Sequence, residues 1–159
     1  MRAGILVLGP LLAKYKLAKV SLPGGCAIGT RPVDITDQRH VMAQAPNGLK
    51  GYKIKFPKIS DGANENLIIA ASLAKGTSIL SNCAIEPEIN DLVNFLNKMG
   101  CNIKWIAKRT IKIVGVSKLK EISYSVMFDR IEAGTYLITG AITEGNLKIK
   151  NIIQEIKMT

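Results

Sequence analysis

The sequence predicts an α/β fold built from repeated helix–turn–strand units. Helical and strand-like segments alternate along the 159 residues, and 47% of the residues are apolar, which is enough for a buried core. An internal repeat supports this prediction: residues 73–82 resemble residues 142–151, and residues 12–22 form a looser third copy. One such unit cannot bury its own apolar face, so several units must pack together around shared helices.

The first third of the chain is expected to hold one helix and two strands. Residues 2–13 read as a buried helix and residues 19–22 as a strand. The segment 36–50 carries turn residues with little periodicity, so its pattern assigns no helix or strand, and His40 is expected to be solvent-exposed with no role. Alternation of lysine with apolar residues predicts a strand at 52–56.

The middle of the chain shows clear helix boundaries. A helix is expected to open at Ser60–Ala63 and to run to about Lys75, with Gly76 as its left-handed cap. A second helix begins at Glu86–Glu88, where a proline and two acids suit the first turn, and it stops at Gly100. Its apolar stripe is expected to be core. Strands are expected at 77–82, 102–106, 110–116, 124–128 and 147–150, and Asp129 with Glu132 should open a further helix.

Composition limits the class of partner. The net charge of +10 favours an anionic partner. Many lysines alternate with apolar residues, as on the solvated face of a sheet, and aromatic residues make up only 5%, so nucleic-acid binding is not expected. No apolar run is long enough to span a membrane. Three widely spaced cysteines form neither a disulfide framework nor a zinc pattern, which indicates a reducing cytoplasm and no metal; Cys83 and Cys101 are expected to be small buried residues.

One stretch, residues 21–34, carries chemistry. Cys26 lies in a loop that contains Gly24, Gly25 and Gly29, with Arg31 nearby. Glycines permit close approach of a ligand to the backbone, and a cationic neighbour favours the thiolate. Spacing alone leaves an incidental cysteine in a Pro-Gly turn equally open.

Together with the start of the chain, this stretch resembles the UDP-N-acetylglucosamine enolpyruvyl transferases, also called UDP-N-acetylglucosamine 1-carboxyvinyltransferases. The resemblance runs from Met1 to about Ile152. Its matching segments are residues 1–13, 22–35, 86–89, 94–96 and 129–135. It implies an inside-out α/β barrel of repeated βαβαββ units, present here as one incomplete domain. The related shikimate-pathway enolpyruvyl transferase shares the fold but lacks a cysteine loop of this kind.

The resemblance also implies an activity: transfer of the enolpyruvyl group from phosphoenolpyruvate to the 3′-hydroxyl of UDP-N-acetylglucosamine, the committed step towards peptidoglycan, with no cofactor. Cys26 matches the family's proton donor, the thiol alkylated by fosfomycin. The positions that match substrate-binding residues are Arg2, Arg31, Pro32, Val33, Asp34, Ile35, Lys58, Ile59, Ser60 and Asp61. The family usually has valine where Asp61 stands, and capping of the helix by this carboxylate is favoured over contact with the diphosphate.

The resemblance covers only part of the family's length. It implies that residues 1–128 form most of the cysteine-bearing domain, shortened around 36–50, that residues 129–152 start the second domain, and that residues 153–159 are an unanchored tail. The family's Lys-Asn pair and its proton-accepting aspartate have no match here. We therefore expect no activity from this chain alone. A complementing fragment of the same enzyme is a candidate partner, and a non-catalytic remnant or nucleotide-sugar-binding module is the alternative function.

Overall fold

The computed structural model describes residues 2–21, 40–150 and 152, with the backbone alone for residues 2–4. The chain divides into two units, Met1–Ser123 and Tyr124–Thr159. The predicted sites at Cys26, Arg31, Pro32, Val33, Asp34 and Ile35, and the tail 153–159, lie outside the described residues.

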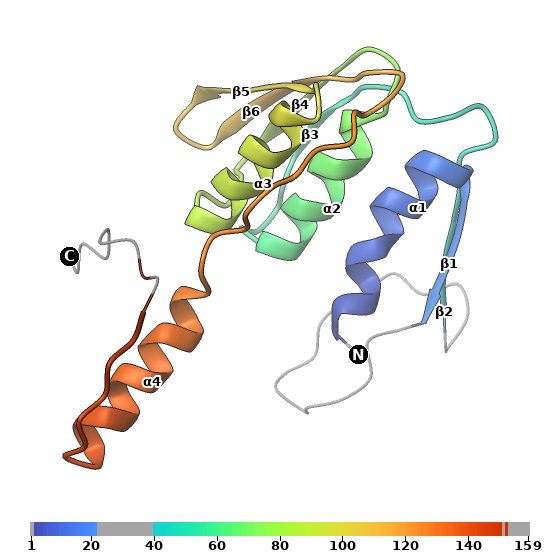
Figure 1. The fold of residues 1–159 in the computed structure, drawn as a ribbon. Helices are drawn as coiled ribbons and strands as arrows, with labels where there is room; N and C mark the ends of the chain where they lie inside the picture. Colours follow the sequence, from blue (N-terminus) through green and yellow to red (C-terminus); the bar gives the residue numbers. More distant parts are fainter. Residues whose placement is uncertain (1, 22–39, 151, 153–159) are drawn as a thin grey trace. The chain divides into compact units, whose positions relative to one another are not determined.

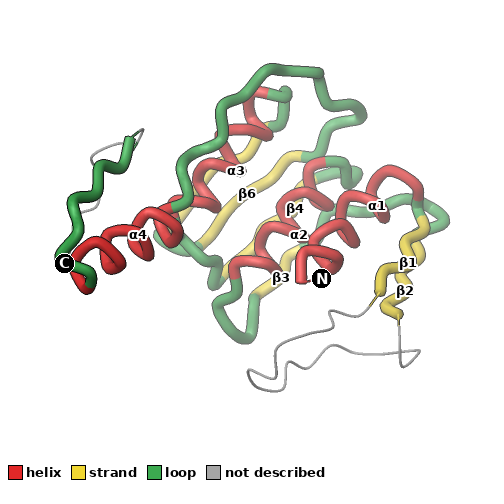
Figure 2. Tube along the Cα trace, turned by 60° about the horizontal axis from the view of Figure 1, so that its bottom comes forward, coloured by secondary structure: helices red, strands yellow, loops and turns green. Residues whose placement is uncertain are grey.

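A four-stranded sheet with two helices on one face forms the centre of the first unit (Figure 1). The strand order is β3 (Lys53–Lys55), β4 (Thr77–Ser81), β6 (Thr110–Val114) and β5 (Asn102–Ala107). β3 and β4 are parallel, and the other neighbours are antiparallel. The helices are α2 (Asp61–Ser72), which connects the two parallel strands, and α3 (Pro87–Lys98) (Figure 2). The βαβ connection of β3, α2 and β4 thus brings the carboxyl ends of both strands to one edge.

The core lies between this sheet and the two helices. Alternation in the strands produces it: Ile111 and Ile113 of β6 are fully buried, whereas Lys112 between them is exposed. The stripe expected on α3 is also buried, at Ile89, Val93 and Leu96. The buried cluster consists of Phe56, Ile68, Ala71, Leu80, Cys83, Ala84, Ile89, Val93, Leu96, Ile103, Ile111 and Ile113.

The opposite face of the sheet is solvated, as the lysine alternation predicts. Lys53, Lys55, Lys104 and Lys112 are all exposed, and Lys104 lies directly across from Lys112. The four strands contain no acidic residue. This face explains part of the positive charge without any anionic partner.

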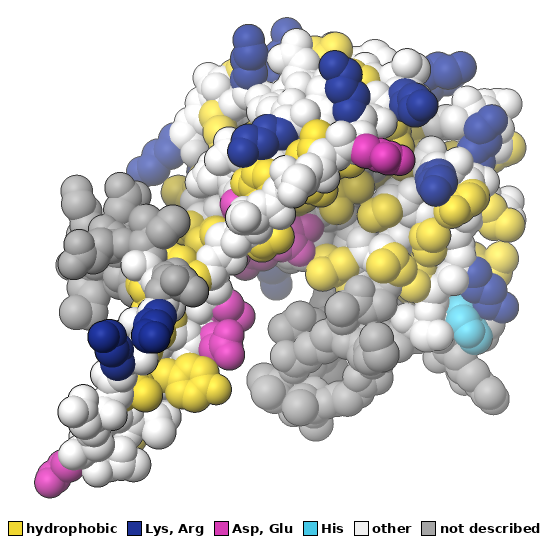
Figure 3. Space-filling model, viewed as in Figure 1, with side chains coloured by type: hydrophobic (Ala, Val, Ile, Leu, Met, Phe, Trp, Pro, Cys, Tyr) yellow, Lys and Arg dark blue, Asp and Glu magenta, His cyan; other side chains and the backbone are white. Residues whose placement is uncertain are grey.

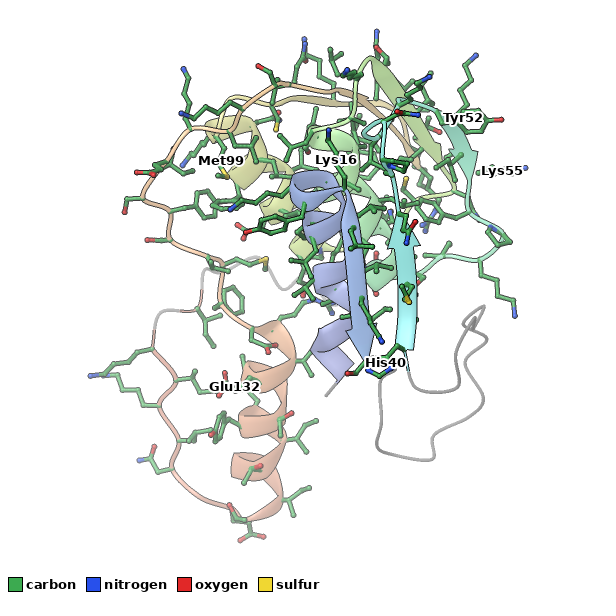
Figure 4. All side chains as sticks on the ribbon, turned by 90° about the vertical axis from the view of Figure 1, so that its right-hand side faces the viewer. Lys16, His40, Tyr52, Lys55, Met99 and Glu132 are labelled. Carbon is green, nitrogen blue, oxygen red and sulfur yellow. The ribbon has the colours of Figure 1, made fainter. Side chains whose placement is uncertain are left out.

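Before the sheet, a helical segment and a hairpin form the start of the first unit. The predicted helix 2–13 is a 3-10 helix, η1 (Arg2–Val7), followed by α1 (Leu8–Tyr15), which packs beside α2. Lys16, in the left-handed conformation, turns the chain into β1 (Leu17–Ser21) (Figure 4). β1 pairs with β2 (His40–Gln44), a strand that the sequence analysis did not expect. Pairing with β1 stabilises this strand despite its weak periodicity.

Two expected boundaries inside the first unit were displaced. α2 ends at Ser72, before the expected Lys75, and its cap is Leu73. Gly76 does adopt a left-handed conformation, with φ of 94°, but it lies in the turn before β4, where its carbonyl accepts a hydrogen bond from the Gly115 N–H at 3.0 Å. The hydrogen bond from the residue just after β6 therefore helps to fix the conformation of Gly76 in this turn.

The second unit contains α4 (Arg130–Ile142), whose first turn is capped as expected. Asp129 Oδ1 accepts hydrogen bonds from the N–H groups of Ile131 at 2.8 Å and Glu132 at 3.1 Å. The predicted strands at 124–128 and 147–150 were wrong, because neither segment is a strand in the structure. A strand requires a neighbouring ladder, and the described residues place none beside these segments.

Candidate active site

The described part of the candidate site lies where β3 and β4 end. Two hydrogen bonds join the chain at these strand ends. Phe56 N–H, just after β3, donates to Ser81 O, in the last residue of β4, at 2.9 Å, and Asn82 Nδ2 donates to Phe56 O at 2.9 Å. The segments that follow lead into the N-terminal ends of α2 and α3. In open α/β sheets, ligands bind outside the carboxyl ends of parallel strands, which makes this edge a suitable place for a site.

Four residues with expected substrate contacts, Lys58, Ile59, Ser60 and Asp61, form the entry to α2 and are exposed. Ser60 is extended, and its Oγ accepts a hydrogen bond from the Ala63 N–H at 3.4 Å, so Ser60 is the N-cap. Asp61 is the first helical residue, and the expectation that Asp61 caps the helix was therefore wrong. The hydroxyl of the preceding residue, Ser60, caps the helix instead.

Acidic residues gather at this edge. Loss of hydration, followed by repulsion from Glu86, raises the pKa of Asp61. Burial, followed by repulsion from Asp61 and Glu88, raises the pKa of Glu65. A hydrogen bond from its own backbone N–H lowers the pKa of Glu86. These carboxylates weaken the attraction that the positive end of α2 offers to an anion.

We expect Asp61→Asn to raise the unfolding midpoint at pH 7 and to lose this effect below pH 3.8. A raised pKa in the folded state means that the folded chain binds more protons, so stability falls as the pH rises through the unfolded value of 3.8 towards the folded one. Because Asp61 is exposed and the helix dipole acts in the opposite direction, the gain should be less than about 1 kcal/mol. Thermal denaturation at pH 7 and pH 3 measures it. The exposed Glu121→Gln is the control; an equal gain in this variant would indicate a general charge effect.

Two asparagines that the sequence analysis missed organise the edge. Asn64 is fully buried, and with its amide oriented to suit its neighbours it donates to Ser60 O at 3.1 Å and accepts from Ala84 N at 3.0 Å. Asn66 Oδ1 accepts from Gly9 N at 2.9 Å, and its Nδ2 donates to Ile5 O at 3.1 Å and Gly62 O at 3.2 Å. The available signal was two amide side chains in the first turns of a largely apolar helix.

The hydrogen bonds of Asn66 therefore connect η1 and α1 to the first turn of α2. Arg2 lies at the start of η1, and its side chain is outside the described residues. The backbone segment that carries Arg2 and the entry segment 58–61 are consequently held near one hydrogen-bonded side chain. The structure thus brings together the backbone of two of the expected substrate-binding segments.

The described residues on either side of the Cys26 segment are neighbours in the structure. Ser21 and His40 are directly paired at the ends of β1 and β2 (Figure 4). His40 is half-buried there, so the expectation of a solvent-exposed side chain was wrong. The strand pairing therefore holds Ser21 and His40, the described residues on either side of 22–39, next to each other.

The two described cysteines are structural. Cys83 is fully buried and its Sγ donates to Leu80 O at 3.3 Å, whereas Cys101 is half-buried. Burial raises the pKa of both thiols, which makes each a poorer nucleophile and proton donor at neutral pH. Among the described residues, no group of three or more His, Cys, Asp or Glu side chains could hold a metal ion. No described helix has both the length and the apolar character needed to cross a bilayer.

Comparison with known families identifies the chain. Residues 1–158 match the family model of EPSP synthase (3-phosphoshikimate 1-carboxyvinyltransferase). The chain belongs to this family. The crystal structure of the enolpyruvyl transferase NikO from Streptomyces tendae superposes with a TM-score of 0.68 at 20% identity, over 86% of this chain and 36% of that one. EPSP synthase from Acinetobacter baumannii superposes with a TM-score of 0.63 at 18% identity, over 88% and 35%. The expected fold is confirmed.

The sequence relatives confirm the more specific resemblance. A UDP-N-acetylglucosamine 1-carboxyvinyltransferase from Pelagibacter ubique is 68% identical, over 100% of this chain and 41% of that protein. Proteins of the same name from Trichlorobacter lovleyi and Gluconobacter oxydans are 48% and 52% identical, over 96% and 92% of this chain and 39% and 38% of their own lengths. The chain thus spans about two fifths of these curated relatives. The alignment with the Pelagibacter protein covers 172 positions against 159 residues here, so that relative carries residues that this chain lacks.

Proposed function

We propose that this chain contributes the cysteine-bearing part of an enzyme that transfers the enolpyruvyl group of phosphoenolpyruvate to the 3′-hydroxyl of UDP-N-acetylglucosamine, a step of peptidoglycan synthesis. The observation that carries the proposal is the 68% identity to a UDP-N-acetylglucosamine 1-carboxyvinyltransferase, which extends over the whole chain, the Cys26 loop included. Fold likeness adds the enolpyruvyl transferase architecture but does not choose the substrate.

In this proposal Cys26 is the general acid. Attack by the sugar hydroxyl on the central carbon of phosphoenolpyruvate requires a proton to be delivered to the neighbouring methylene carbon, and a positioned thiol supplies it. Phosphate then leaves while the new methyl group gives up a proton, which restores the carbon–carbon double bond of the enolpyruvyl ether. The guanidinium of Arg31 suits two phosphate oxygens, whereas residues 32–35 and 58–61 would contact the nucleotide part of the sugar substrate.

The share of the relatives' length that this chain matches supports a proposal about its domains. Residues 1–128 would form most of the domain that carries Cys26, and residues 129–152 would start a second domain. Because the chain spans about two fifths of its relatives, we propose that the group that accepts the sugar proton lies in the remaining part. The chain alone should therefore not turn over substrate. We place the reaction in the cytoplasm, since both described cysteines are free thiols.

The test is release of phosphate from phosphoenolpyruvate in the presence of UDP-N-acetylglucosamine. The 159-residue chain is assayed alone and with a second polypeptide that carries the part of the Pelagibacter protein that this chain does not match. We expect release only from the mixture, and a fall of about 10²- to 10⁴-fold in the Cys26→Ala variant, the usual contribution of a general acid. Cys101→Ala, a half-buried thiol outside the site, is the matched control. An unchanged rate in Cys26→Ala would remove this thiol from the mechanism.

A non-catalytic nucleotide-sugar-binding module is the second candidate. It is favoured by the residues that this chain lacks relative to the Pelagibacter protein. This function predicts that UDP-N-acetylglucosamine raises the unfolding midpoint of the chain, whereas phosphate is never released with or without the second polypeptide. Calorimetry at millimolar ligand without heat, and no shift of the midpoint, would exclude it.

A further inference from the structure

Asn82, the residue just after β4, has an unusual backbone conformation. Its φ is 61°, in the left-handed region that non-glycine residues seldom adopt. The other described non-glycine residues with positive φ are Lys16 and Glu144, which lie at the C-terminal ends of α1 and α4, where this conformation commonly closes a helix. Asn82 follows a strand, so that explanation does not apply to it. A strained residue beside a candidate site points to a functional reason for the strain.

The residues on either side of Asn82 hold it in this conformation. Ser81, which precedes it, is the last residue of β4 and is paired with Thr110 of β6. Cys83, which follows it, exchanges two hydrogen bonds with Arg109. The Cys83 N–H donates to Arg109 O at 3.0 Å, and Arg109 Nη1 donates to Cys83 O at 2.9 Å. The side chain of Asn82 therefore extends from a fixed base.

The side-chain amide of Asn82 binds the residue at the end of β3. Its Nδ2 donates to Phe56 O at 2.9 Å, while Phe56 N–H donates to Ser81 O at 2.9 Å. Both backbone groups of Phe56 are thus held by two consecutive residues at the end of the neighbouring strand. Pro57 follows, and its ring fixes its own φ and restricts Phe56 to extended backbone. The direction of the chain at Phe56 is therefore carried into Lys58.

The entry segment 58–61 is in this way anchored on both sides. On the side of the helix, Ser60 O accepts from the backbone N–H of Asn64 at 3.1 Å and, with the amide oriented as described above, from the Asn64 side chain at 3.1 Å. On the side of the strand, the anchor is the bond between Asn82 and Phe56, two residues before Lys58. The first anchor belongs to α2 itself, whereas the second depends on a side chain from the end of another strand.

The carboxylates around the entry segment make its exact placement important. Asp61 lies close enough to Glu86 and Glu65 for mutual repulsion, and Figure 3 shows acidic side chains gathered where α2 and α3 begin. Because these charges oppose an anion, binding of a phosphate group here would depend on short-range hydrogen bonds from the backbone. Such bonds weaken steeply when donor and acceptor are misaligned.

We propose that Asn82 is a positioning residue for the substrate site. Its amide fixes the point at which segment 58–61 leaves β3 and thereby sets the affinity for the phosphate-bearing part of a nucleotide sugar. The inference rests on the proposed function, and it requires no contact between Asn82 and the substrate. Because the segment would hold the nucleotide part equally in the ground state and in the transition state, loss of the amide should raise KM and leave kcat unchanged.

The test compares two variants in the phosphate-release assay with the second polypeptide. Asn82→Gly removes the amide and adopts the left-handed backbone without strain, whereas Asn82→Ala removes the same amide and is strained there. Both should raise the KM for UDP-N-acetylglucosamine about 3- to 10-fold, the contribution of one hydrogen bond, with kcat within about twofold of the parent. Asn82→Ala should also have the lower unfolding midpoint. A KM that rises only in this less stable variant would overturn the proposal.

Asn97→Ala is the matched control. Asn97 Nδ2 donates to Ile103 O at 2.9 Å, and its Oδ1 accepts from Ile103 N at 2.9 Å. An amide of the same kind thus joins α3 to β5, at the end of α3 away from the entry segment. This variant should lower the unfolding midpoint and keep the parent's KM. An equal rise of KM in Asn97→Ala would mean that stability and not placement sets the affinity, and would overturn the proposal.

Hydrogen exchange of the chain alone separates this inference from the proposed function. In Asn82→Gly the Phe56 N–H should exchange about 3- to 10-fold faster. The Ile79 N–H, which joins the same two strands by donating to Tyr52 O at 3.0 Å, should exchange at close to the parent's rate.

The two failures then look different. If the parent mixture releases phosphate and Asn82→Gly has the parent's KM, the proposed function stands and this inference fails. If the parent mixture releases none, the proposed function fails and exchange decides this inference. Faster exchange at Phe56 in the variant would uphold the placement of segment 58–61 by Asn82, whereas equal rates would overturn it as well.

Discussion

Gly115→Ala is expected to destabilise the first unit by about 3 kcal/mol, the upper end of the usual cost of overpacking. Gly115 lies just after β6, and its N–H donates to the Gly76 carbonyl at 3.0 Å. A Cβ at this position would overlap the carbonyl oxygen of Ala74 and lie 2.8 Å from the Ala74 carbonyl carbon. Since these are backbone atoms of the segment just after α2, no side-chain rotation can relieve the overlap. Urea denaturation followed by circular dichroism measures the loss.

The control for Gly115 is another glycine of the same unit. Gly62 lies in the first turn of α2, where an added Cβ would meet only Leu6 Cδ2, at an ordinary 3.4 Å. Gly62→Ala should therefore leave the unit as stable or slightly more stable, because alanine favours the helix. Equal losses in the two variants would show that the overlap at Ala74 is not the cause.

Ile111→Ala is expected to cost about 3 kcal/mol, within the 2–5 kcal/mol usual for an isoleucine truncated in a core. Ile111 is 0% exposed at the centre of the sheet, paired with Leu80 on one side and Trp105 on the other. Removing its outer carbons leaves a space that the two flanking strands cannot close. Denaturant titration gives the difference in unfolding free energy.

An exposed isoleucine on the adjacent strand provides the comparison. Ile106 of β5 is 54% exposed, and Ile106→Ala should change the free energy of unfolding by no more than about 0.5 kcal/mol. A loss at Ile111 no larger than that at Ile106 would mean that the centre of the sheet does not unfold with the rest of the unit.

Local sequence patterns correctly predicted the helices and strands that pack against other described elements. β6 and α3 match their alternation and apolar stripe, because the sheet and the helices that complete the core are all present. β2 was not predicted because its sequence alternates only weakly. Its pairing with β1, which precedes residues 22–39, stabilises it as a strand. The strands expected at 124–128 and 147–150 failed for the opposite reason, since their patterns are strand-like but no described strand pairs with them.

The candidate site was predicted from motifs more than from geometry. The motif identified Lys58–Asp61, and the structure places this segment at the carboxyl edge of parallel strands. Spacing could not reveal the acidic surroundings of Asp61, because Glu86, which repels it, is the N-cap residue of a different helix, α3. Spacing also could not reveal the roles of Asn64 and Asn66, because each binds a partner that is distant in sequence, Ala84 for Asn64 and Gly9 for Asn66. The residues around Cys26 stay a prediction.

The hydrogen bonds of Asn66 couple two stretches that are distant in sequence, the N-terminal helical segment and the first turn of α2. A change in the position of the first turn of α2 must be transmitted to the backbone at Ile5 and Gly9, because one planar amide holds all three. If an anion binds at the first turn of α2, the backbone at Ile5–Gly9 is already held in place. The conformational entropy of ordering that backbone would then be lost during folding and not during binding. In the proposed enzyme, Asn66 would in this way contribute to substrate affinity without touching the substrate.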